Sequence, residues 1–279
     1  MIKLQPGLNE CSNAEYHADK EYVSSSGLKV ALKDIALFKH QIIDGNRPEF
    51  SNKAALEDGS LTHALLLEPH NVHQDFVFWN GLRKSGNQWE TFVAELSSDD
   101  RNKVIISKPQ RLRVDSYIAA FKRRKEAVNM LTGGFAEQTI CGEIDGVKIK
   151  VRFDYINVDL GIIYDIKTTG KPADLHTFKQ TATDLSYQLS AALYCRLAEQ
   201  YYGRKFDFIF IVISKQDPQD CQLYKTSAVT MAEGNSMVDT AISKIKSARE
   251  TGIYSEKLTD EAHQSDSINL ESSYEILEV

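Results

Sequence analysis

Two strand-like segments in the second half of the chain carry the residues best suited to chemistry. The segment 151–156 contains Asp154, and the segment 162–169 contains Asp165 and Lys167. If the two segments pair as a hairpin about the turn between them, the aspartates face each other, and strand alternation points Asp165 and Lys167 to one face. Two carboxylates this close repel each other unless a divalent cation lies between them. Oxygen-rich ligation favours Mg²⁺, with Mn²⁺ as a substitute.

Lys167 suits a role beside such a metal, because its ammonium group can position water or stabilise charge that develops on a phosphodiester. Another explanation is open for the Asp-x-Lys triplet alone, since these residues on a strand can form a solvent-facing ion pair. The surroundings favour chemistry. The triplet lies in an apolar strand, follows a second Asp-bearing strand and precedes Thr168-Thr169-Gly170.

The same run of residues resembles a known nuclease core. Arg152-Phe153-Asp154, followed by Tyr164-Asp165-Ile166-Lys167-Thr168-Thr169, is similar to the core of the RecB-type PD-(D/E)XK nucleases, and more closely to that of the RecE-type exonucleases (exodeoxyribonuclease VIII). The segment 59–69 resembles the helix on which that family carries a metal-binding histidine, here His63. Glu137-Gln138 precedes the core as in RecE. The resemblance runs from about Ser24 to Ser214.

The resemblance implies a set of metal ligands and a catalytic lysine. His63, Asp154, Asp165 and the backbone carbonyl of Ile166 would hold one metal ion, with Lys167 as the catalytic lysine together with the two aspartates. Glu137 would assist a second ion. Taken alone, His63 would be interpreted as an ordinary core or surface histidine, and only the surrounding match favours a ligand.

The resemblance also suggests DNA contacts. Gln188 lies where the family carries a glutamine used near the DNA, although an exposed polar residue on a helix needs no function. RecB-type motifs place a tyrosine four residues later, whereas this chain has Ala192 there and offers Tyr187 or Tyr194 instead. Thr168 could donate to a phosphate oxygen, but a β-branched residue at the end of a strand is equally ordinary.

Hydrophobic periodicity and turn residues predict the elements that must position these side chains. We expect a serine-capped helix over 28–38, a helix over 54–68 that carries His63, and a long loop or small subdomain over 72–107. The remaining expected elements are a helix over 109–131, an antiparallel meander of strands over 136–141, 147–158 and 161–168, a helix over 184–202, a buried strand over 206–214, an edge strand over 223–229 and a helix over 234–250.

These elements predict an α/β protein with a PD-(D/E)XK, restriction-endonuclease-like core, in which helices flank a central mixed β-sheet and further helices are added at the N-terminus. We expect one exonuclease domain over 1–254, with a helical part over about 24–131 and the catalytic core over about 135–230. Residues 255–279 are rich in Glu, Asp and Ser and are expected to form an acidic, loosely ordered tail.

Composition restricts the class of protein. The 279 residues carry a formal net charge of −6, which counts against a large basic surface but allows a local DNA channel. The four cysteines form no CxxC pair, so a disulfide scaffold or zinc site is not indicated, and Cys141 and Cys195 are expected in the core. No apolar run approaches the roughly 20 residues of a membrane span. We therefore expect a cytoplasmic protein without a membrane partner, and the resemblance to RecE-type exonucleases implies that it is bacterial or phage-encoded.

Four functions follow as hypotheses. The first, implied by the resemblance, is a 5′→3′ exonuclease on linear double-stranded DNA that leaves 3′ overhangs for recombination. Its expected partners are DNA ends, further copies of the chain in a trimeric or tetrameric ring, and a RecT-like single-strand annealing protein. The second is a repair, restriction or CRISPR-adaptation nuclease with the same core. The others are a catalytically silent DNA-binding module of this fold and an unrelated carboxylate metalloenzyme.

Overall fold

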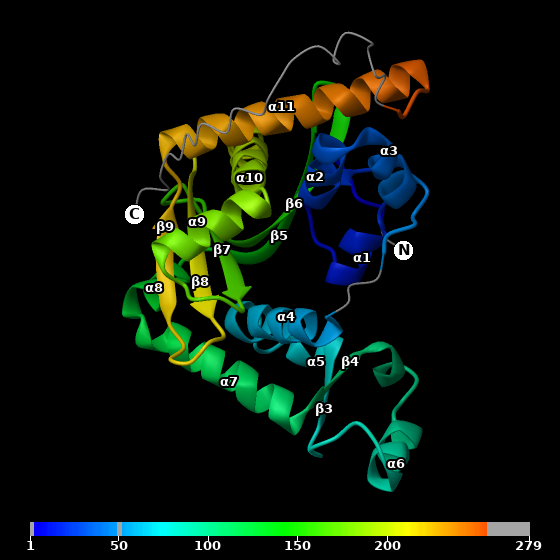
Figure 1. Cartoon of the computed structure of the whole chain (residues 1–279), viewed down its shortest axis with the longest axis vertical. Coiled ribbons are helices and arrows are strands. Elements are labelled where there is room, and N and C mark those ends of the chain that lie inside the picture. The colour runs from blue at the N-terminus through cyan, green and yellow to red at the C-terminus, as the bar shows by residue number, and fades with distance from the viewer. Residues whose placement is uncertain (1–2, 49–51, 256–279) are drawn as a thin grey trace, which may run out of the picture.

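A mixed β-sheet forms the centre of the molecule (Figure 1). The computed structural model describes residues 3–48 and 52–255, and within them seven strands form this sheet in the order β1-β5-β6-β7-β8-β9, with β2 beside β6. The strands are β1 (Gly7–Asn9), β2 (Val23–Ser24), β5 (Phe135–Ile144), β6 (Val147–Asn157), β7 (Ile162–Thr169), β8 (Asp207–Ser214) and β9 (Cys221–Lys225). The predicted antiparallel meander of β5, β6 and β7 is confirmed, and β8 runs parallel to β7.

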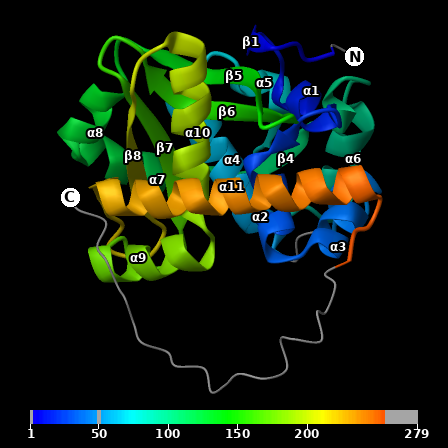
Figure 2. The same cartoon turned by 90° about the horizontal axis from the view of Figure 1, so that it is seen from above.

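Helices cover both faces of this sheet. In Figure 1, α10 (Tyr187–Tyr202), α11 (Ala228–Thr251) and α2 (Ser25–Lys33) lie above it, and α4 (Lys53–Leu67) and α7 (Lys108–Arg123) lie below. Seen from above, α11 crosses over α10 and α2, against which it packs (Figure 2). Each face buries its own apolar cluster. The predicted α/β architecture, a central mixed sheet flanked by helices, is therefore confirmed.

Local signals account for the helix that carries His63. Asn52 caps α4 by accepting a hydrogen bond from the N–H of Ala55, and the helix ends two residues before Pro69, which cannot continue it. The serine-capped helix expected over 28–38 is α2, capped by Ser24, followed by the short α3 (Ile35–Phe38) and the π-helical turn Lys39–Ile43. The prediction of a helix at each place is confirmed.

The prediction of a single helix over 109–131 is wrong. The chain forms α7 and then a separate α8 (Lys125–Met130), because Arg124 is extended with φ −86° and ψ 90°. Phe121 and Ala127 lie six residues apart, which places them about 120° apart around a continuous helix. Both are nevertheless buried in the same cluster, and the break at Arg124 allows this.

The helix predicted over 184–202 starts too early. Residue 184 ends a separate helix, α9 (Leu175–Asp184), which the periodicity did not reveal, and α10 begins only at Tyr187. Ser186 separates the two helices in a left-handed conformation, with φ 50° and ψ 50°. Together α9 and α10 supply the crossover that joins the parallel strands β7 and β8.

Residues 72–107 form the small subdomain, which was one of the two expected alternatives. Its strands β3 (Phe76–Trp79) and β4 (Val104–Ser107) pair in parallel apart from the main sheet. They are accompanied by α5 (Val72–Asp75), α6 (Asn87–Glu95) and the 3₁₀ turn Asp100–Asn102.

At the ends of the chain, several boundaries differ from the prediction. The edge strand expected over 223–229 is β9, and α11 begins six residues earlier than expected because Ser227 caps it at the N–H of Thr230. The first residues, which showed no periodicity, form β1, α1 (Asn13–Ala18) and β2. The expected acidic tail lies outside the described residues apart from Ser255. Within the described part of the chain, no helix is long and apolar enough to cross a bilayer.

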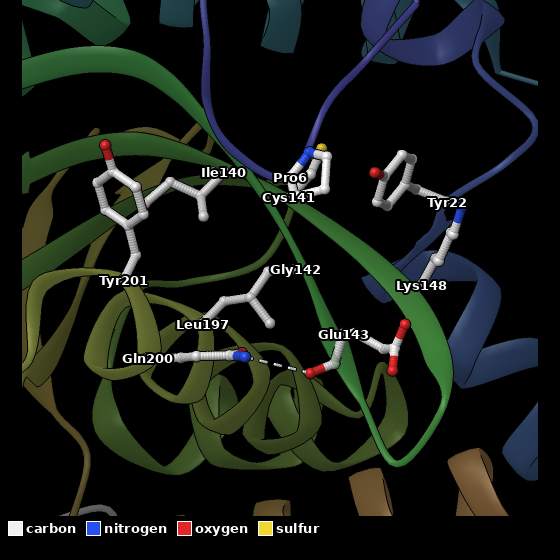
Figure 3. A pocket seen from close by; sticks show the side chains of 11 residues that line it. Pro6, Tyr22, Ile140, Cys141, Gly142, Glu143, Lys148, Leu197, Gln200 and Tyr201 are labelled. Carbon is white, nitrogen blue, oxygen red and sulfur yellow. Dashed lines mark hydrogen bonds between the residues drawn. The ribbon is translucent and has the colours of Figure 1, made fainter.

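A hollow of about 480 Å³ lies between β1, β5 and the C-terminal end of α10 (Figure 3). Ile140, Cys141, Leu197 and Tyr201 provide much of its lining. It contains none of Asp154, Asp165 and Lys167, so it is separate from the residues whose chemistry the sequence indicates.

Candidate metal centre

Asp154 lies where β6 and β7 begin to separate. The ladder between these strands has three rungs and ends at Tyr155–Tyr164. Beyond this rung, a side chain replaces the backbone acceptor: Oδ2 of Asp154 accepts a hydrogen bond from the backbone N–H of Ile166 at 2.7 Å. The next rung would have joined Asp154 to Asp165, so the two aspartates lie beside each other, as the hairpin register predicted.

Glu137 extends this acidic row onto the third strand. The β5–β6 ladder has rungs on both sides, at Ala136–Tyr155 and Gln138–Phe153, but not at Glu137, which faces Asp154. Glu137 has φ 50°, a left-handed conformation that a non-glycine residue rarely adopts. Such strained residues are concentrated at functional sites.

The alternation of β6 changes phase at the same place. Phe153 packs in the cluster shared with α10, whereas Tyr155, two residues later on the same strand, packs in the cluster shared with α4. In a regular strand, residues two apart point to the same face. Asp154 therefore lies at a local distortion between the two layers, within reach of helices on both sides.

His63 approaches this row from α4. Its Nδ1 lies 3.5 Å from Oδ2 of Asp154. His63, Glu137 and Asp154 each offer one ligand atom, and these three atoms lie within 4.8 Å of one another. All three side chains are partly buried. The structure thus brings together an imidazole nitrogen and two carboxylates from three separate elements.

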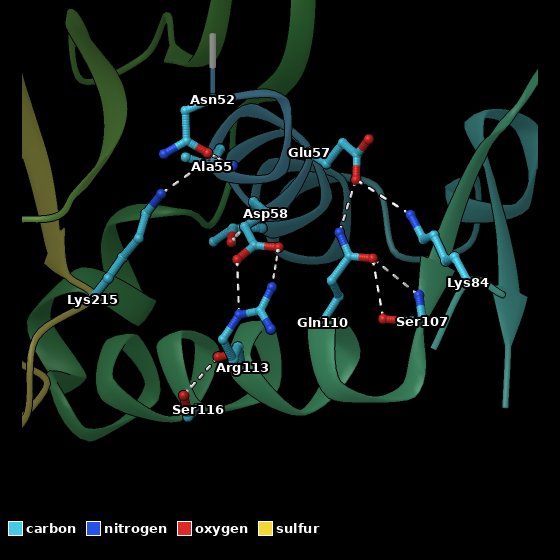
Figure 4. Close-up of polar contacts among 11 residues, drawn as sticks. Asn52, Ala55, Glu57, Asp58, Lys84, Ser107, Gln110, Arg113, Ser116 and Lys215 are labelled. Carbon is cyan, nitrogen blue, oxygen red and sulfur yellow. Dashed lines mark hydrogen bonds and ion pairs between the residues drawn. The ribbon is translucent and has the colours of Figure 1, made fainter. Parts of the chain in front are cut away.

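Polar contacts hold α4 in place beneath the sheet (Figure 4). The guanidinium of Arg113 on α7 donates twice to the buried carboxylate of Asp58, with distances of 3.2 and 3.3 Å. Gln110 of α7 donates to Glu57 at 2.8 Å, and Lys215 donates to the carbonyl of Ala55 at 3.3 Å. A buried charge requires such partners, so these contacts fix the helix that presents His63.

Asp165 and Lys167 form an ion pair on β7. Asp165 is buried, and its Oδ2, although in this ion pair, makes no hydrogen bond with the described residues. The ammonium of Lys167 lies 5.3 Å from the ring centroid of Tyr187, which stacks on Phe210 of β8. The aromatic stack limits where the lysine can move, and a cation over such a ring is attracted to it.

The charges of these groups depend strongly on one another. Burial raises the pKa of Asp165, and Asp154 adds to that effect. Burial and the same neighbour also raise the pKa of Glu137. Burial would lower the pKa of His63 and of Lys167, but the adjacent carboxylates outweigh burial and raise both. Burial disfavours the anion of Asp154 too, yet the positive neighbours His63 and Lys167 lower its pKa overall.

These properties fit a divalent cation. One imidazole and two carboxylates offer the nitrogen and oxygen ligands that Mn²⁺ accepts, and the carboxylates suit Mg²⁺. The pKa values of Glu137 and Asp165 are raised because burial and the Asp154 carboxylate disfavour the two anions more than the neighbouring Arg152 and Lys167 favour them, and a bound cation would favour both anions. The buried Asp165 oxygen without a hydrogen bond points the same way.

The positions of the expected residues differ from the sequence-based set in one respect. The cluster of three ligand atoms contains Glu137, the residue expected only to assist a second ion, while the Asp165 carboxylate turns to Lys167. Thr168 follows Lys167 and faces α4, where an added Cβ at Gly59 would lie 3.4 Å from its Oγ1. Gln188 is buried against α11, and its amide donates to Glu233 at 3.5 Å.

Two cations near the site were not among the predicted site residues. Arg152 donates to Glu137 at 2.7 Å, and Lys29 of α2 lies 5.1 Å from the Tyr187 ring centroid. Arg152 stands two residues before Asp154 on the same strand, so alternation could have indicated it. No sequence signal connects Lys29 with residue 187, because the contact depends on how α2 packs against α10.

Comparison with solved structures supports the fold. A crystal structure of a candidate exonuclease from Eubacterium rectale aligns over 93 % of this chain and 95 % of its own, with a TM-score of 0.65 and 18 % identity. The protein SSO0001 aligns over 79 % of this chain and 84 % of its own at 16 % identity, but its TM-score of 0.30 supports no argument. No curated protein sequence matched.

A family model gives the clearest result. The model of the PDDEXK-like domain of unknown function (DUF3799) matches residues 24–260, which is most of the chain. The match includes the acidic row, His63, Lys167 and Tyr187. The sequence-based assignment to the PD-(D/E)XK superfamily is thereby confirmed, and the chain belongs to the PDDEXK-like DUF3799 family.

Proposed function

We propose that this protein is a divalent-metal-dependent exodeoxyribonuclease that degrades one strand of linear duplex DNA from its 5′ end and leaves a 3′ overhang. The observation that carries the proposal is the convergence of His63, Glu137, Asp154, Asp165 and Lys167 from four elements. The family and the fold support a nuclease. Polarity and duplex preference rest on the resemblance to RecE-type exonucleases, and the exonuclease name of the Eubacterium rectale protein agrees with it.

His63, Asp154, Asp165 and the carbonyl of Ile166 would hold the metal, Mg²⁺ or Mn²⁺, and Glu137 would take part directly or through a second ion. When bound, such an ion supplies charge stabilisation at the phosphodiester and activation of water. Nδ1 of His63 already points toward Asp154, and its imidazole would bind the ion in the deprotonated form.

Lys167 would stabilise charge on the phosphate. Its carboxylate neighbours raise its pKa, so it stays protonated at neutral pH and can donate but not accept a proton. Tyr187 would keep its ammonium in place. Thr168 is a candidate donor to the DNA backbone. Gln188 could reach DNA only after leaving its contact with Glu233.

A recombination role is part of the proposal. A 3′ overhang is the substrate of a RecT-like annealing protein, which would be the partner. A trimeric or tetrameric ring around the DNA would retain the substrate between cuts. This would not require a strongly basic surface.

The test uses linear duplex DNA labelled at either the 5′ or the 3′ end, with closed circles as a second substrate. We expect Mg²⁺-dependent early release of the 5′ label from linear DNA. Asp154→Asn and Lys167→Ala should each lower the rate about a hundredfold or more, as loss of a charged group that stabilises the transition state does. Lys225→Ala is the matched control, since this exposed lysine at the end of the edge strand β9 pairs with the exposed Asp207 of β8.

Other outcomes would replace the proposal. Cleavage of closed circles would indicate another type of PD-(D/E)XK nuclease, and early release of the 3′ label would reverse the polarity. Binding of DNA ends without any cleavage would indicate a silent module. Equal rates for wild type and Asp154→Asn would remove the metal centre from the reaction.

A further inference from the structure

The residues before the family match are fastened to β6 along one line. We name residues 11–24 the N-terminal strap; only Ser24 of it lies within the matched range 24–260. Alternate residues of β6, Lys148, Lys150 and Arg152, all reach the strap. The next alternate position on the strand is Asp154. The line of cations that holds the strap therefore leads directly to the metal centre.

The middle cation of this line is a buried anchor. Lys150 donates to the carbonyl oxygens of Tyr16 and Asp19, and its ammonium lies 3.6 Å from the Asp19 carboxylate. Its side chain is 5 % exposed. A buried ammonium is costly unless it is fully partnered, and here the partners all belong to the strap. Lys150 and the strap therefore stabilise each other's position.

The innermost cation joins the strap to the metal centre. Nε of Arg152 donates to Oε2 of Glu137 at 2.7 Å, while its Nη1 donates to the carbonyl of Cys11 at 2.9 Å and to Oγ1 of Thr139 at 3.1 Å. The planar guanidinium fixes the directions of these bonds relative to one another. Holding the Cys11 carbonyl thus determines where the bond to Glu137 can point.

Glu137 needs such support. Its left-handed φ of 50° is unfavourable for a residue with a side chain, and its neighbours on β5 are in the ladder while it is not. A strained conformation of this kind persists only when its surroundings hold it. Its carboxylate belongs to the three-ligand cluster with His63 and Asp154.

We infer that Arg152 is a positioning residue for the metal-binding carboxylate of Glu137, and that the N-terminal strap fixes Arg152 through the Cys11 carbonyl. This rests on the metal-binding part of the proposed function. The strap then contributes to metal binding by fixing Arg152, although it lies almost entirely outside the matched family range.

The direction in which cation affinity changes when Arg152 is removed distinguishes a positioning role from simple charge neutralisation. If Arg152 only neutralised Glu137, its removal would leave a more negative site and tighten cation binding. If Arg152 positions Glu137, its removal weakens binding. Loss of a residue that orients a metal ligand typically lowers metal affinity about 10–100-fold.

The experiment is Mn²⁺ binding to the full chain, measured by calorimetry and by electron paramagnetic resonance of free Mn²⁺. For Arg152→Gln we expect a dissociation constant about tenfold higher than that of wild type. Arg152→Lys, which keeps the charge but not the fork, should fall in between. Lys225→Gln is the matched control, because it removes an exposed cation that pairs with Asp207 away from the strap and should leave Mn²⁺ binding unchanged. Arg152→Gln binding as tightly as wild type, or more tightly, would overturn the inference.

The strap is tested with Asp19→Asn, which removes the ion pair to Lys150 and leaves Arg152 intact. We expect the Cys11 thiol of this variant to react faster with Ellman's reagent than that of wild type, and we expect a severalfold loss of Mn²⁺ affinity. Faster labelling with unchanged affinity would overturn the role of the strap. If Arg152→Gln does not fold, Arg152→Lys decides, and affinity equal to wild type counts against the positioning role. A wild type that binds Mn²⁺ but cuts no DNA would remove only the proposed function, whereas a wild type that binds no Mn²⁺ would remove both.

Discussion

Two lysines approach the same aromatic ring at the edge of the metal centre. Lys167 and Lys29 lie 5.3 and 5.1 Å from the centroid of Tyr187. Burial lowers the pKa of Lys29 from 10.5 to about 8, and the positive charge of Lys167 adds to this effect. Lys29 also donates to the carbonyl of Leu185 at 2.7 Å. Its charge is therefore held at a cost in the folded state.

That cost predicts a pH-dependent stability. Below about pH 8 both the folded and the unfolded chain carry the Lys29 charge. From about pH 8 to 10.5 the unfolded chain binds a proton that the folded chain lacks, so this residue makes stability rise with pH. Lys29→Met should be more stable than wild type at pH 7, and the difference should shrink toward pH 10. Urea unfolding at pH 7, 9 and 10 measures this.

The control for this prediction is Lys33→Met, which removes an exposed lysine from the same helix. It should show little difference from wild type at any of these pH values. A Lys29→Met difference that stays constant from pH 7 to 10 would contradict a lowered Lys29 pKa.

Residue chemistry near the strands could be predicted from sequence, whereas contacts between distant segments could not. The Asp-x-Lys triplet and the hairpin register predicted that Asp154 and Asp165 lie side by side. The left-handed conformation of Glu137 leaves no mark on the residue type, since glycine or asparagine would be usual there. Lys29 meets Tyr187 only because of helix packing.

Among the secondary-structure elements, the helices α10 and α11 approach each other closely at Gly234. A Cβ added at Gly234 of α11 would lie 2.2 Å from the carbonyl oxygen of Gln188 and 2.9 Å from the Cβ of Ala192. Backbone atoms cannot yield as a flexible side chain can. Gly234 thus sets the distance between α11 and the helix that carries Tyr187.

We expect Gly234→Ala to destabilise the protein by about 1–3 kcal/mol, the usual cost of overpacking. This loss must exceed the gain of up to about 1 kcal/mol that alanine brings to a helix. Ser236→Ala, at an exposed position of α11, is the control and should be neutral or slightly stabilising. Thermal unfolding compares the two variants. Equal stability of Gly234→Ala and wild type would show that α10 and α11 can separate without cost.

Periodicity predicted most elements but not their interruptions. The basic run 122–125 continues a helical pattern, yet the helix breaks at Arg124, and Phe121 and Ala127 on either side of the break are buried in the same cluster. Ser186 likewise ends one helix and starts another without Gly or Pro. Tertiary packing overrides local preference at both places.

At the scale of the whole molecule, thiol burial offers a direct measure of integrity. Cys11 in the strap is partly exposed, while Cys141, Cys195 and Cys221 are buried. Burial raises the pKa of Cys141 and of Cys221 to about 12, and it also raises that of Cys195. The buried thiols are therefore protonated as well as inaccessible at pH 8.

Ellman's reagent at pH 8 should modify one thiol of the native protein quickly and the other three only after unfolding. Cys11→Ser should remove the fast reaction and leave the slow one unchanged. Two or more fast thiols in the wild type would contradict the described burial. The two cysteines predicted to be core residues, Cys141 and Cys195, are buried as expected.

The net charge of the whole chain was a poor indicator of DNA binding because it averages over parts of the chain that differ in charge. Residues 256–279 contain seven acidic residues and one basic residue, which equals the net charge of −6 of the whole sequence. Residues 1–255 are therefore balanced in formal charge. The acidic segment expected over 255–279 thus accounts for the whole net charge, so the value of −6 does not describe the charge of the part that contains the metal centre.

The chain order of the site also bears on how the protein matures during synthesis. His63 leaves the ribosome well before Glu137 and Asp154, and β7 gains its parallel neighbour β8 only after α9 and α10 have been made. Contacts between such distant segments form slowly because long loops must close first. The strap is separated from its partners by a still longer stretch of chain, since the residues of β6 that bind it are synthesised more than a hundred residues later. A nascent chain would thus carry every ligand before it could hold a metal, and the nuclease would stay inactive until its sheet is complete.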